Sequence, residues 1–265
     1  MLSARTRTAT AMAFRDQRRR PLVLILLVLV PLFLVLWSVA ITKTTPHPVE
    51  LPGGAWVTTT MKALHGPEMA KISVAFVAAL VGVFVIQSAL QGDRRLVVAG
   101  FRAGEAVLAR LAVLTTATGL VVVVSALVMA LSFSPASWPP VIAALLLTGL
   151  IYATIGALAG ALLDTLAATY LILFLAMTDF GVVQTPMFHA TPGRFAWLLP
   201  GYAPTRLMVD GAYSHTFNAG GDLLLALTWA GALAITVYLV LRRQLGARAV
   251  PLLRRASGGG VRGGV

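Results

Sequence analysis

Long runs of apolar residues, each close to the length that crosses a lipid bilayer, decide what this chain can fold into. A helix needs about 20 mostly apolar residues to cross the hydrocarbon core of a membrane. Of the 265 residues, 58% are hydrophobic and 11% are charged, whereas about a quarter of a soluble domain is charged. We therefore predict an all-α, polytopic membrane protein with six transmembrane helices. The predicted spans are residues 22–41, 70–90, 106–131, 141–163, 166–183 and 222–241.

These spans divide the chain into three parts. Residues 1–21 form a basic N-terminal segment, residues 22–241 the transmembrane domain, and residues 242–265 a basic tail whose glycine-rich end we expect to be disordered. Residues 38–40 have the small-x-small form of a signal cleavage site. The apolar run before them is longer than the ~7 to 15 residues typical of a signal, which favours a retained first span.

The distribution of basic residues predicts the orientation. Six spans place both termini on one side, and that side carries 16 of the 21 basic residues, against 5 on the other. An excess of arginine and lysine in short loops is typical of the cytoplasmic side. We expect a multi-pass protein of a bacterial-type cytoplasmic membrane with both termini in the cytoplasm. Because the arginines flank apolar runs, we do not expect nucleic-acid binding.

The connections between the spans differ in character. Residues 42–69 are rich in proline and glycine and are predicted to be a loop, and residues 132–140 a short turn with Trp138 at the membrane surface. Asp164 is predicted to cap the fifth span, which makes the fourth and fifth spans antiparallel neighbours. Residues 184–221 contain several prolines but many apolar residues, so we expect short interfacial or re-entrant helices on the outer face.

The connection after the second span is charged and amphipathic. We expect residues 91–93 to end that span and residues 94–105 to form a short helix in the cytoplasmic interface. Such a helix either rests on the lipid surface or docks a cytoplasmic partner.

Patterns that support catalysis are missing from the sequence. There is no cysteine, and the four histidines show no zinc-binding spacing. The chain also has no glycine-rich phosphate loop, so we expect no ATP hydrolysis by the usual route on this chain and no enzyme activity.

A few residues within or next to the spans stand out. Asp179 either lines a path or anchors the broken segment after it, because an ionisable group in a span is costly and faces the protein interior or water. Gln87 shows a weaker version of the same ambiguity, and Gln184 follows at the outer end. Gly156 and Gly160 form a small-xxx-small pattern, which allows two helices to approach closely.

This layout resembles the ABC-2 type transporter permease family. The similarity rests on the six spans, the basic segment before the first, the connector with Asp93-Arg94-Arg95 and Gly100, and the broken outer segment that contains residues 198–206. The resemblance implies a coupling element that contacts an ATPase. Its residues would be Arg94, Arg95, Gly100, Phe101, Arg102 and Glu105.

The resemblance further implies an exporter subunit that pairs with a second six-span half and with two cytoplasmic ATPase subunits. ATP and magnesium would then bind to the ATPase, and this chain would carry no cofactor. The first, second and fifth spans would border the pathway, with Asp179, Gln184 and Gln87 along it or at its outer gate. Drugs, lipids, glycans and peptides all remain open as substrates. A secondary transporter and a non-transporting scaffold or immunity protein remain alternatives.

Overall fold

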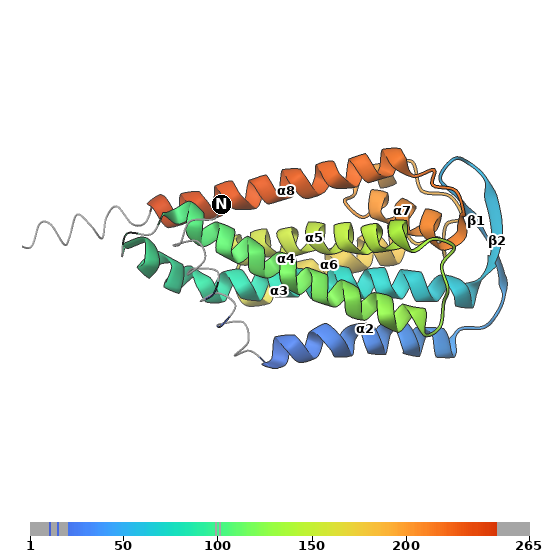
Figure 1. Ribbon diagram of the computed structural model, residues 1–265, viewed down its shortest axis with the longest axis horizontal. Helices are drawn as coiled ribbons and strands as arrows, with labels where there is room; N and C mark the ends of the chain where they lie inside the picture. Colours follow the sequence, from blue (N-terminus) through green and yellow to red (C-terminus); the bar gives the residue numbers. More distant parts are fainter. Residues whose placement is uncertain (1–10, 12–14, 16–20, 99, 101, 248–265) are drawn as a thin grey trace, which may run out of the picture.

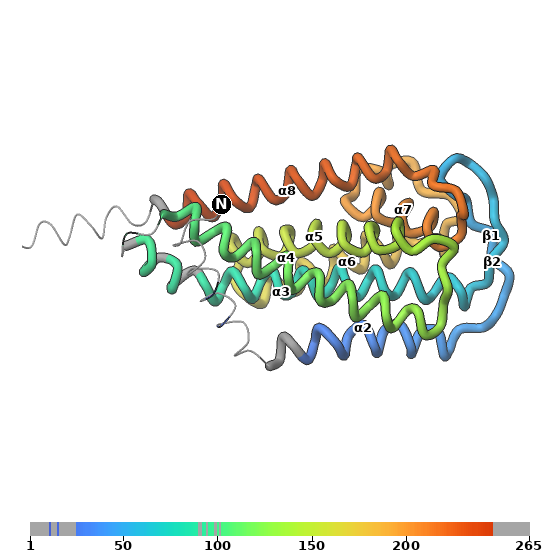
Figure 2. The backbone as a smooth tube through the Cα atoms, in the orientation of Figure 1, coloured from blue at the N-terminus to red at the C-terminus, as the bar shows by residue number. Residues whose placement is uncertain are grey.

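The computed structural model describes residues 11, 15, 21–98, 100 and 102–247 of the chain. The fold is an elongated bundle in which consecutive long helices run antiparallel (Figure 1). The chain reverses direction at each connection between the long helices, as the tube in Figure 2 shows. Its elements, in order, are α2 (Pro21–Ile41), β1 (Pro46–Glu50), β2 (Trp56–Thr60), α3 (Met61–Val98), α4 (Ala103–Ala130), α5 (Trp138–Leu162), α6 (Thr165–Thr178), η1 (Asp179–Val183), η2 (Ala196–Leu198), α7 (Tyr202–Tyr213) and α8 (Gly220–Ala247).

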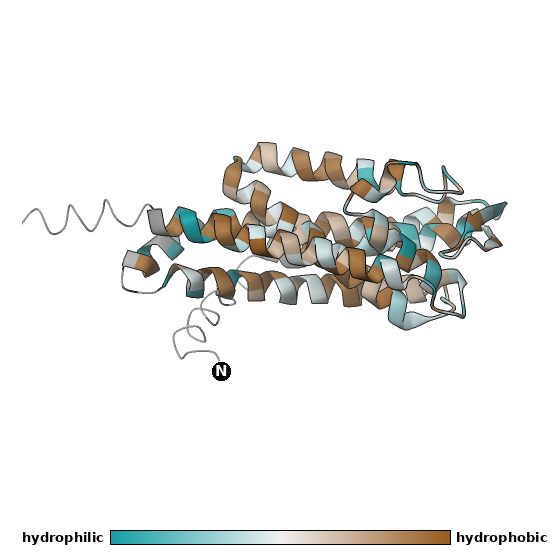
Figure 3. Ribbon diagram, turned by 90° about the horizontal axis from the view of Figure 1, so that it is seen from above, coloured by the Kyte–Doolittle hydropathy of each residue, from teal (hydrophilic) through white to brown (hydrophobic). Residues whose placement is uncertain are grey.

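Within the described residues, five helices are long and apolar enough to cross a membrane. Hydrophobic residues lie along the helices, and the more hydrophilic stretches gather toward the ends of the bundle (Figure 3). Helix α2 contributes a shorter apolar helix, Ile25–Ile41. The chain is thus a helical membrane protein. The five helices span Met61–Ala89, Ala103–Ala130, Trp138–Leu162, Thr165–Val183 and Gly220–Leu245.

The chain is mostly helical, as predicted, but part of the predicted loop over residues 42–69 forms two β-strands. β1 and β2 form an antiparallel hairpin in which Val49 pairs with Val57. Gly53 and Gly54 in its turn have φ of 99° and 83°, a left-handed conformation that glycine adopts without strain. The buried Val49 side chain packs in one cluster with Leu64. This tertiary contact stabilises a strand that proline-rich sequence alone did not predict.

Helix α3 also begins earlier than predicted, at Met61. Pro67 lies inside it and cannot donate a hydrogen bond to the carbonyl of Ala63 four residues before. The Tyr213 hydroxyl of α7 donates to that carbonyl at 3.3 Å. The helix therefore tolerates Pro67 because Tyr213, 150 positions from Ala63 in the sequence, supplies the missing donor.

The apolar span within α3 ends at Ala89, close to the predicted end at residue 90. The helix itself does not break at residues 91–93, however, and the separate helix predicted over residues 94–105 is wrong. Helix α3 continues to Val98, and α4 begins at Ala103 after a tight turn. Asp93 is buried and forms an ion pair with Arg110 of α4 at 2.8 Å. The charge of Asp93, which suggested a helix end, is thus neutralised by Arg110 of the neighbouring helix. At 1.5 Å per residue, α3 is about 57 Å long, well beyond the ~30 Å hydrocarbon core.

Helices α3 and α5 meet along a seam of glycines. A Cβ atom on Gly156 would lie 2.0 Å from the Ala79 carbonyl oxygen, and one on Gly82 would lie 2.3 Å from that of Ala153. A Cβ atom on Gly160 would meet the backbone of Val83 at 2.8 Å. These contacts confirm that the small-xxx-small pattern allows a close helix approach.

The remaining connections follow the predictions. The Asp164 side chain caps α6 by accepting a hydrogen bond from the Ala167 N–H at 2.9 Å. The segment between the last two spans contains the short helices η2 and α7. The N-terminal basic segment, apart from residues 11, 15 and 21, lies outside the described residues, and so does the tail from residue 248.

Candidate functional site

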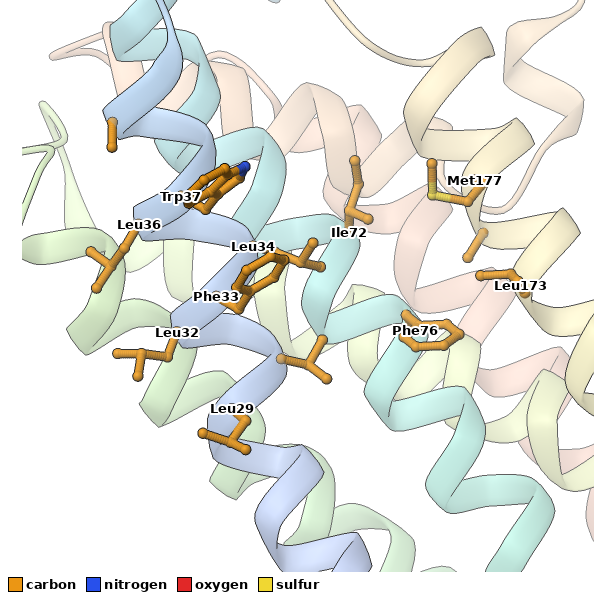
Figure 4. Close-up of a pocket in the computed structure, with 13 residues that line it drawn as sticks. Leu29, Leu32, Phe33, Leu34, Leu36, Trp37, Ile72, Phe76, Leu173 and Met177 are labelled. Carbon is orange, nitrogen blue, oxygen red and sulfur yellow. The ribbon is translucent and has the colours of Figure 1, made fainter.

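A groove of about 930 Å³ lies between α2, α3 and α6. Figure 4 shows α2 on one side, α6 on the other and α3 in the middle. The rings of Phe33 and Trp37 stack on α2 with their centroids 6.0 Å apart, and both side chains are more than half exposed. Phe76 of α3 and Met177 of α6 also line the groove.

Every side chain that lines the groove is apolar. The complete lining is Leu29, Val30, Leu32, Phe33, Leu34, Leu36, Trp37, Ala40, Ile72, Phe76, Leu173, Ala176 and Met177. Such a surface binds hydrocarbon or aromatic groups by excluding water or lipid, and it offers almost no hydrogen bonds to a sugar or a charged group. The groove thus joins the first, second and fifth of the predicted spans.

A network of buried polar groups holds the hairpin end of the bundle together. Lys71 of α3 is fully buried, and its Nζ lies 2.9 Å from Glu68 Oε1 and 2.9 Å from Thr205 Oγ1 of α7. The Thr205 hydroxyl donates in turn to the Gly201 carbonyl at 2.8 Å. Breaking a buried ion pair by removal of one partner is costly, and the contact with Thr205 makes this pair a link between α3 and α7.

Asp179 is the centre of a second set of contacts. Its side chain is fully buried at the start of η1, where Oδ2 accepts hydrogen bonds from the Tyr152 hydroxyl at 2.6 Å and from the Gly201 N–H at 2.8 Å. A Cβ atom on Gly201 would lie 2.6 Å from this carboxylate, so a larger residue there would have to displace the Asp179 side chain. Asp179 therefore anchors the segment after α6, which is one of the two roles considered for it.

Gln184 belongs to the same end, but Gln87 does not. The Gln184 amide is buried and donates to the Ala196 carbonyl of η2 at 2.8 Å. Gln87 accepts a hydrogen bond from the Thr165 hydroxyl at 2.7 Å and donates to the Leu163 carbonyl at 3.2 Å. Thr165 is 14 residues from Asp179 along α6, about 21 Å. The three residues assigned to a path or gate thus lie at opposite ends of the bundle, and none of them lines the groove.

Sequence reasoning missed Glu68, Lys71 and Tyr152. In the charge count, Lys71 is simply one of the five basic residues on the side opposite the termini. The spacing of Glu68 and Lys71, three residues apart at the edge of an apolar run, is the signal that points to a buried pair. No comparable signal marks Tyr152, because its partner Asp179 lies 27 residues away.

Helix α7 carries two further buried groups outside the spans. Burial raises the pKa of the Asp210 carboxyl above its ordinary value, although the Asn218 N–H donates to it at 3.1 Å and Arg206 lies nearby. Burial likewise raises the pKa of the Tyr213 hydroxyl, and the charge of Glu68 adds to this effect.

The predicted coupling residues lie at the opposite end, around the turn between α3 and α4. Arg95 and Arg102 are exposed, and Gly100 has a φ of +94° that suits glycine. The Arg102 N–H donates to Glu105 Oε2 at 3.3 Å, which closes the first turn of α4. The side chain of Arg94 and all of Phe101 lie outside the described residues.

Among the residues that the structure describes, no group of three or more histidine, cysteine, aspartate or glutamate side chains is placed to hold a metal ion. Comparison with known proteins gives no match, either to a protein-family model or to a curated sequence.

Proposed function

We propose that this chain is the membrane subunit of an ATP-driven exporter of the ABC-2 type, in which α2 is a sixth transmembrane helix. The observation that carries the proposal is the apolar groove between α2, α3 and α6. These are the three helices that the family resemblance assigns to the pathway. In this proposal a second six-span half closes the groove.

The turn between α3 and α4 is the proposed docking surface for a separate ATPase. Arg95 and Arg102 are exposed there, and the Asp93–Arg110 ion pair fixes the two helices relative to each other. A rigid connection of this kind can transmit a movement of a cytoplasmic partner to α3, one of the helices that line the groove. ATP and magnesium would bind to the partner, in keeping with the missing phosphate loop.

The orientation and the location are part of the proposal. Both ends of the chain would face the cytoplasm of a bacterial-type membrane, and the hairpin, η2 and α7 would face outward. The excess of basic residues at the α3–α4 turn and after α8 supports this arrangement.

The first experiment is co-purification of the chain from its own membranes in mild detergent, with identification of the bound proteins. We expect an ATPase to bind the native chain and to be lost from the double variant Arg95→Glu, Arg102→Glu. The matched control is Arg242→Glu, Arg243→Glu, which reverses two exposed charges at the same end of the bundle but on α8. Loss of the ATPase from both variants, or no ATPase with the native chain, would contradict the proposal.

A second experiment tests whether another half closes the groove. Because the chain has no cysteine, a single cysteine introduced at Phe33 can react only with a cysteine on another copy or with an added reagent. We expect oxidation to cross-link Phe33→Cys between copies if the halves are identical. Ile235→Cys, an exposed position on α8, should not cross-link. A paralogous second half would instead appear in the co-purification.

One observation favours the alternative of a secondary transporter. Glu68, Lys71 and Asp179 are buried charged groups, and such groups form ion sites in transporters of that class. They are, however, engaged with neighbouring helices and do not line the groove. Uptake into liposomes that contain only this chain, driven by an ion gradient without ATP, would favour the alternative.

A further inference from the structure

Two cavities adjoin each other at the hairpin end of the bundle, and they share no lining residue with the groove. One is about 330 Å³ and is lined by polar and aromatic side chains, among them Glu50, Arg194, Trp197, Tyr202 and Arg206. The other is about 500 Å³ and is mainly apolar, with Val183, Phe195, Leu198 and Leu199 in its wall. Gly193 and Arg194 line both cavities, so they share a border.

Their position matches the boundary between hydrocarbon and lipid headgroups. The apolar cavity includes Val183, the last residue of the apolar helix that could cross the membrane. The polar cavity is bounded by Glu50 of the hairpin and by α7. Trp197 is 55% exposed beside it, and tryptophan is enriched where membrane meets water.

The two arginines have unused capacity to bind an anion. Within the described part of the chain, Arg194 forms no ion pair, and its guanidinium lies 5.9 Å from the centre of the Phe195 ring. Arg206 forms an ion pair with Asp222, whose Oδ2 lies 3.6 Å from its Nε, and it also lies near Asp210. Its Nε has no hydrogen-bond partner among the described residues, so its N–H groups keep room for a further acceptor. A guanidinium pairs well with the oxygens of a phosphate or a carboxylate.

Glu50 lines the same cavity and restricts the kind of head group that can bind there. A carboxylate repels a bare anion but accepts hydrogen bonds from hydroxyl or amine groups. A head that combines a phosphate with hydroxyl or amine donors therefore fits this wall better than an isolated phosphate does. The apolar cavity next to it offers Phe195, Leu198 and Leu199 to a hydrocarbon chain.

We propose that the two cavities form one binding site for a membrane amphiphile, with its phosphate-bearing head at Arg194 and Arg206 and its hydrocarbon chain along Phe195 and Leu198. This inference goes beyond the proposed function, because the site is complete on this chain whether or not an ATPase binds at the opposite end.

The test is native mass spectrometry of the purified chain in detergent with added phosphatidylglycerol, whose head carries a phosphate and two hydroxyls. We expect Arg194→Gln to weaken binding by about tenfold. Phe195→Ser should also weaken it, and Arg194→Lys should retain part of it. The matched control, Arg243→Gln, removes an exposed charge from the opposite end and should bind like the native chain.

Two further probes separate head from chain. Diacylglycerol has the same hydrocarbon chains without the phosphate, and glycerol phosphate has the head without the chains, and we expect both to bind more weakly than phosphatidylglycerol. Equal binding of diacylglycerol would show that the arginines contribute nothing, and equal binding of glycerol phosphate would show that the apolar cavity contributes nothing. Either result, or equal binding by Arg194→Gln and Arg243→Gln, would overturn the proposal. None of these results depends on co-purification of an ATPase.

Discussion

The two sides of helix α3 are packed in opposite ways. Toward α5, glycines bring the backbones into direct contact, as at Gly156 against Ala79. Toward α2 and α6, large side chains such as Phe76 and Leu173 leave a groove of about 930 Å³ between the helices. In the most apolar 18-residue stretch of α3, 83% of the residues are buried within the protein. In the corresponding stretch of Thr165–Val183, which contains α6, 28% are buried.

This difference distinguishes two parts of the bundle. We call α3 and α5, whose backbones are in contact, the frame, and α2 and α6 are the helices that surround the groove beside it. Backbone contacts cannot adjust to a shift of the helices, so α3 and α5 must behave as one body. The helices around the groove can move relative to α3 at lower cost, because lipid or another apolar molecule can replace the contacts they lose. The buried network around Lys71 and Asp179 adds α7 and η1 to the frame.

The largest effect should come from breaking the ionic part of the frame. Lys71→Met leaves the buried Glu68 carboxylate without its partner, and we expect a loss of about 3 to 5 kcal/mol in the free energy of unfolding. Chemical denaturation in detergent micelles measures this loss. The double variant Glu68→Gln, Lys71→Met removes both charges and should recover most of the stability. A single variant as stable as the native chain would contradict the role assigned to the pair.

The second largest loss of stability should come from adding a methyl group to a glycine of the seam between α3 and α5. Gly156→Ala places a Cβ atom against the Ala79 backbone, and we expect a loss of about 2 to 3 kcal/mol by overpacking. Gly231→Ala on α8 is the control, because no atom lies within 4 Å of its new Cβ atom and alanine favours a helix. Equal stability of the two variants would show that the seam is looser than the structure indicates.

A smaller, pH-dependent effect should come from Asp210, at the hairpin end of the frame. The pKa of Asp210 is raised by burial above its ordinary value of 3.8. As pH rises past that value, the unfolded chain loses this proton before the folded chain does, so Asp210 makes stability fall with rising pH. Asp210→Asn should remove this contribution, which appears as a difference between the two melting temperatures measured from pH 4 to pH 8. A difference that does not change with pH would contradict it.

The smallest effect should come from the groove. Leu173→Ala removes a side chain that is 41% exposed, and we expect a loss of about 1 kcal/mol or less. Its neighbour Ile172 is fully buried on the same helix, and Ile172→Ala should cost about 2 to 5 kcal/mol. If the two variants lose the same stability in micelles, the contrast between the buried face of α6 and its groove face is wrong.

Parts of the site were visible in the sequence because their signals are local. The small-xxx-small spacing predicted close packing at Gly156 and Gly160, and the Asp164 cap predicted a tight connection. Helix-breaking residues after α6 predicted that Asp179 could anchor the next segment. Each of these predictions needs only the residues within a turn or two of the chain.

The parts that were missed depend on residues far apart in the sequence. Lys71 and Thr205 are separated by 134 positions, and Pro67 is tolerated through the Tyr213 hydroxyl. The charge of Asp93 suggested a helix end because its partner could not be identified from the sequence. That partner, Arg110, lies in the next helix and neutralises Asp93 within the protein. A polar residue is expected to be exposed to solvent unless the residue that pairs with it in the protein interior is known.

The sequence by itself determined that this chain forms apolar helices long enough for a membrane, where most of them start, and which helix face is small enough to pack closely. These features follow from residue type and spacing, which act along one helix. Only the tertiary structure decided that α2, α3 and α6 surround an apolar groove, that a hairpin covers the end of the bundle, and that buried charges join α3 to α7. In those features the free energy comes from pairs of groups that only the folded chain brings together.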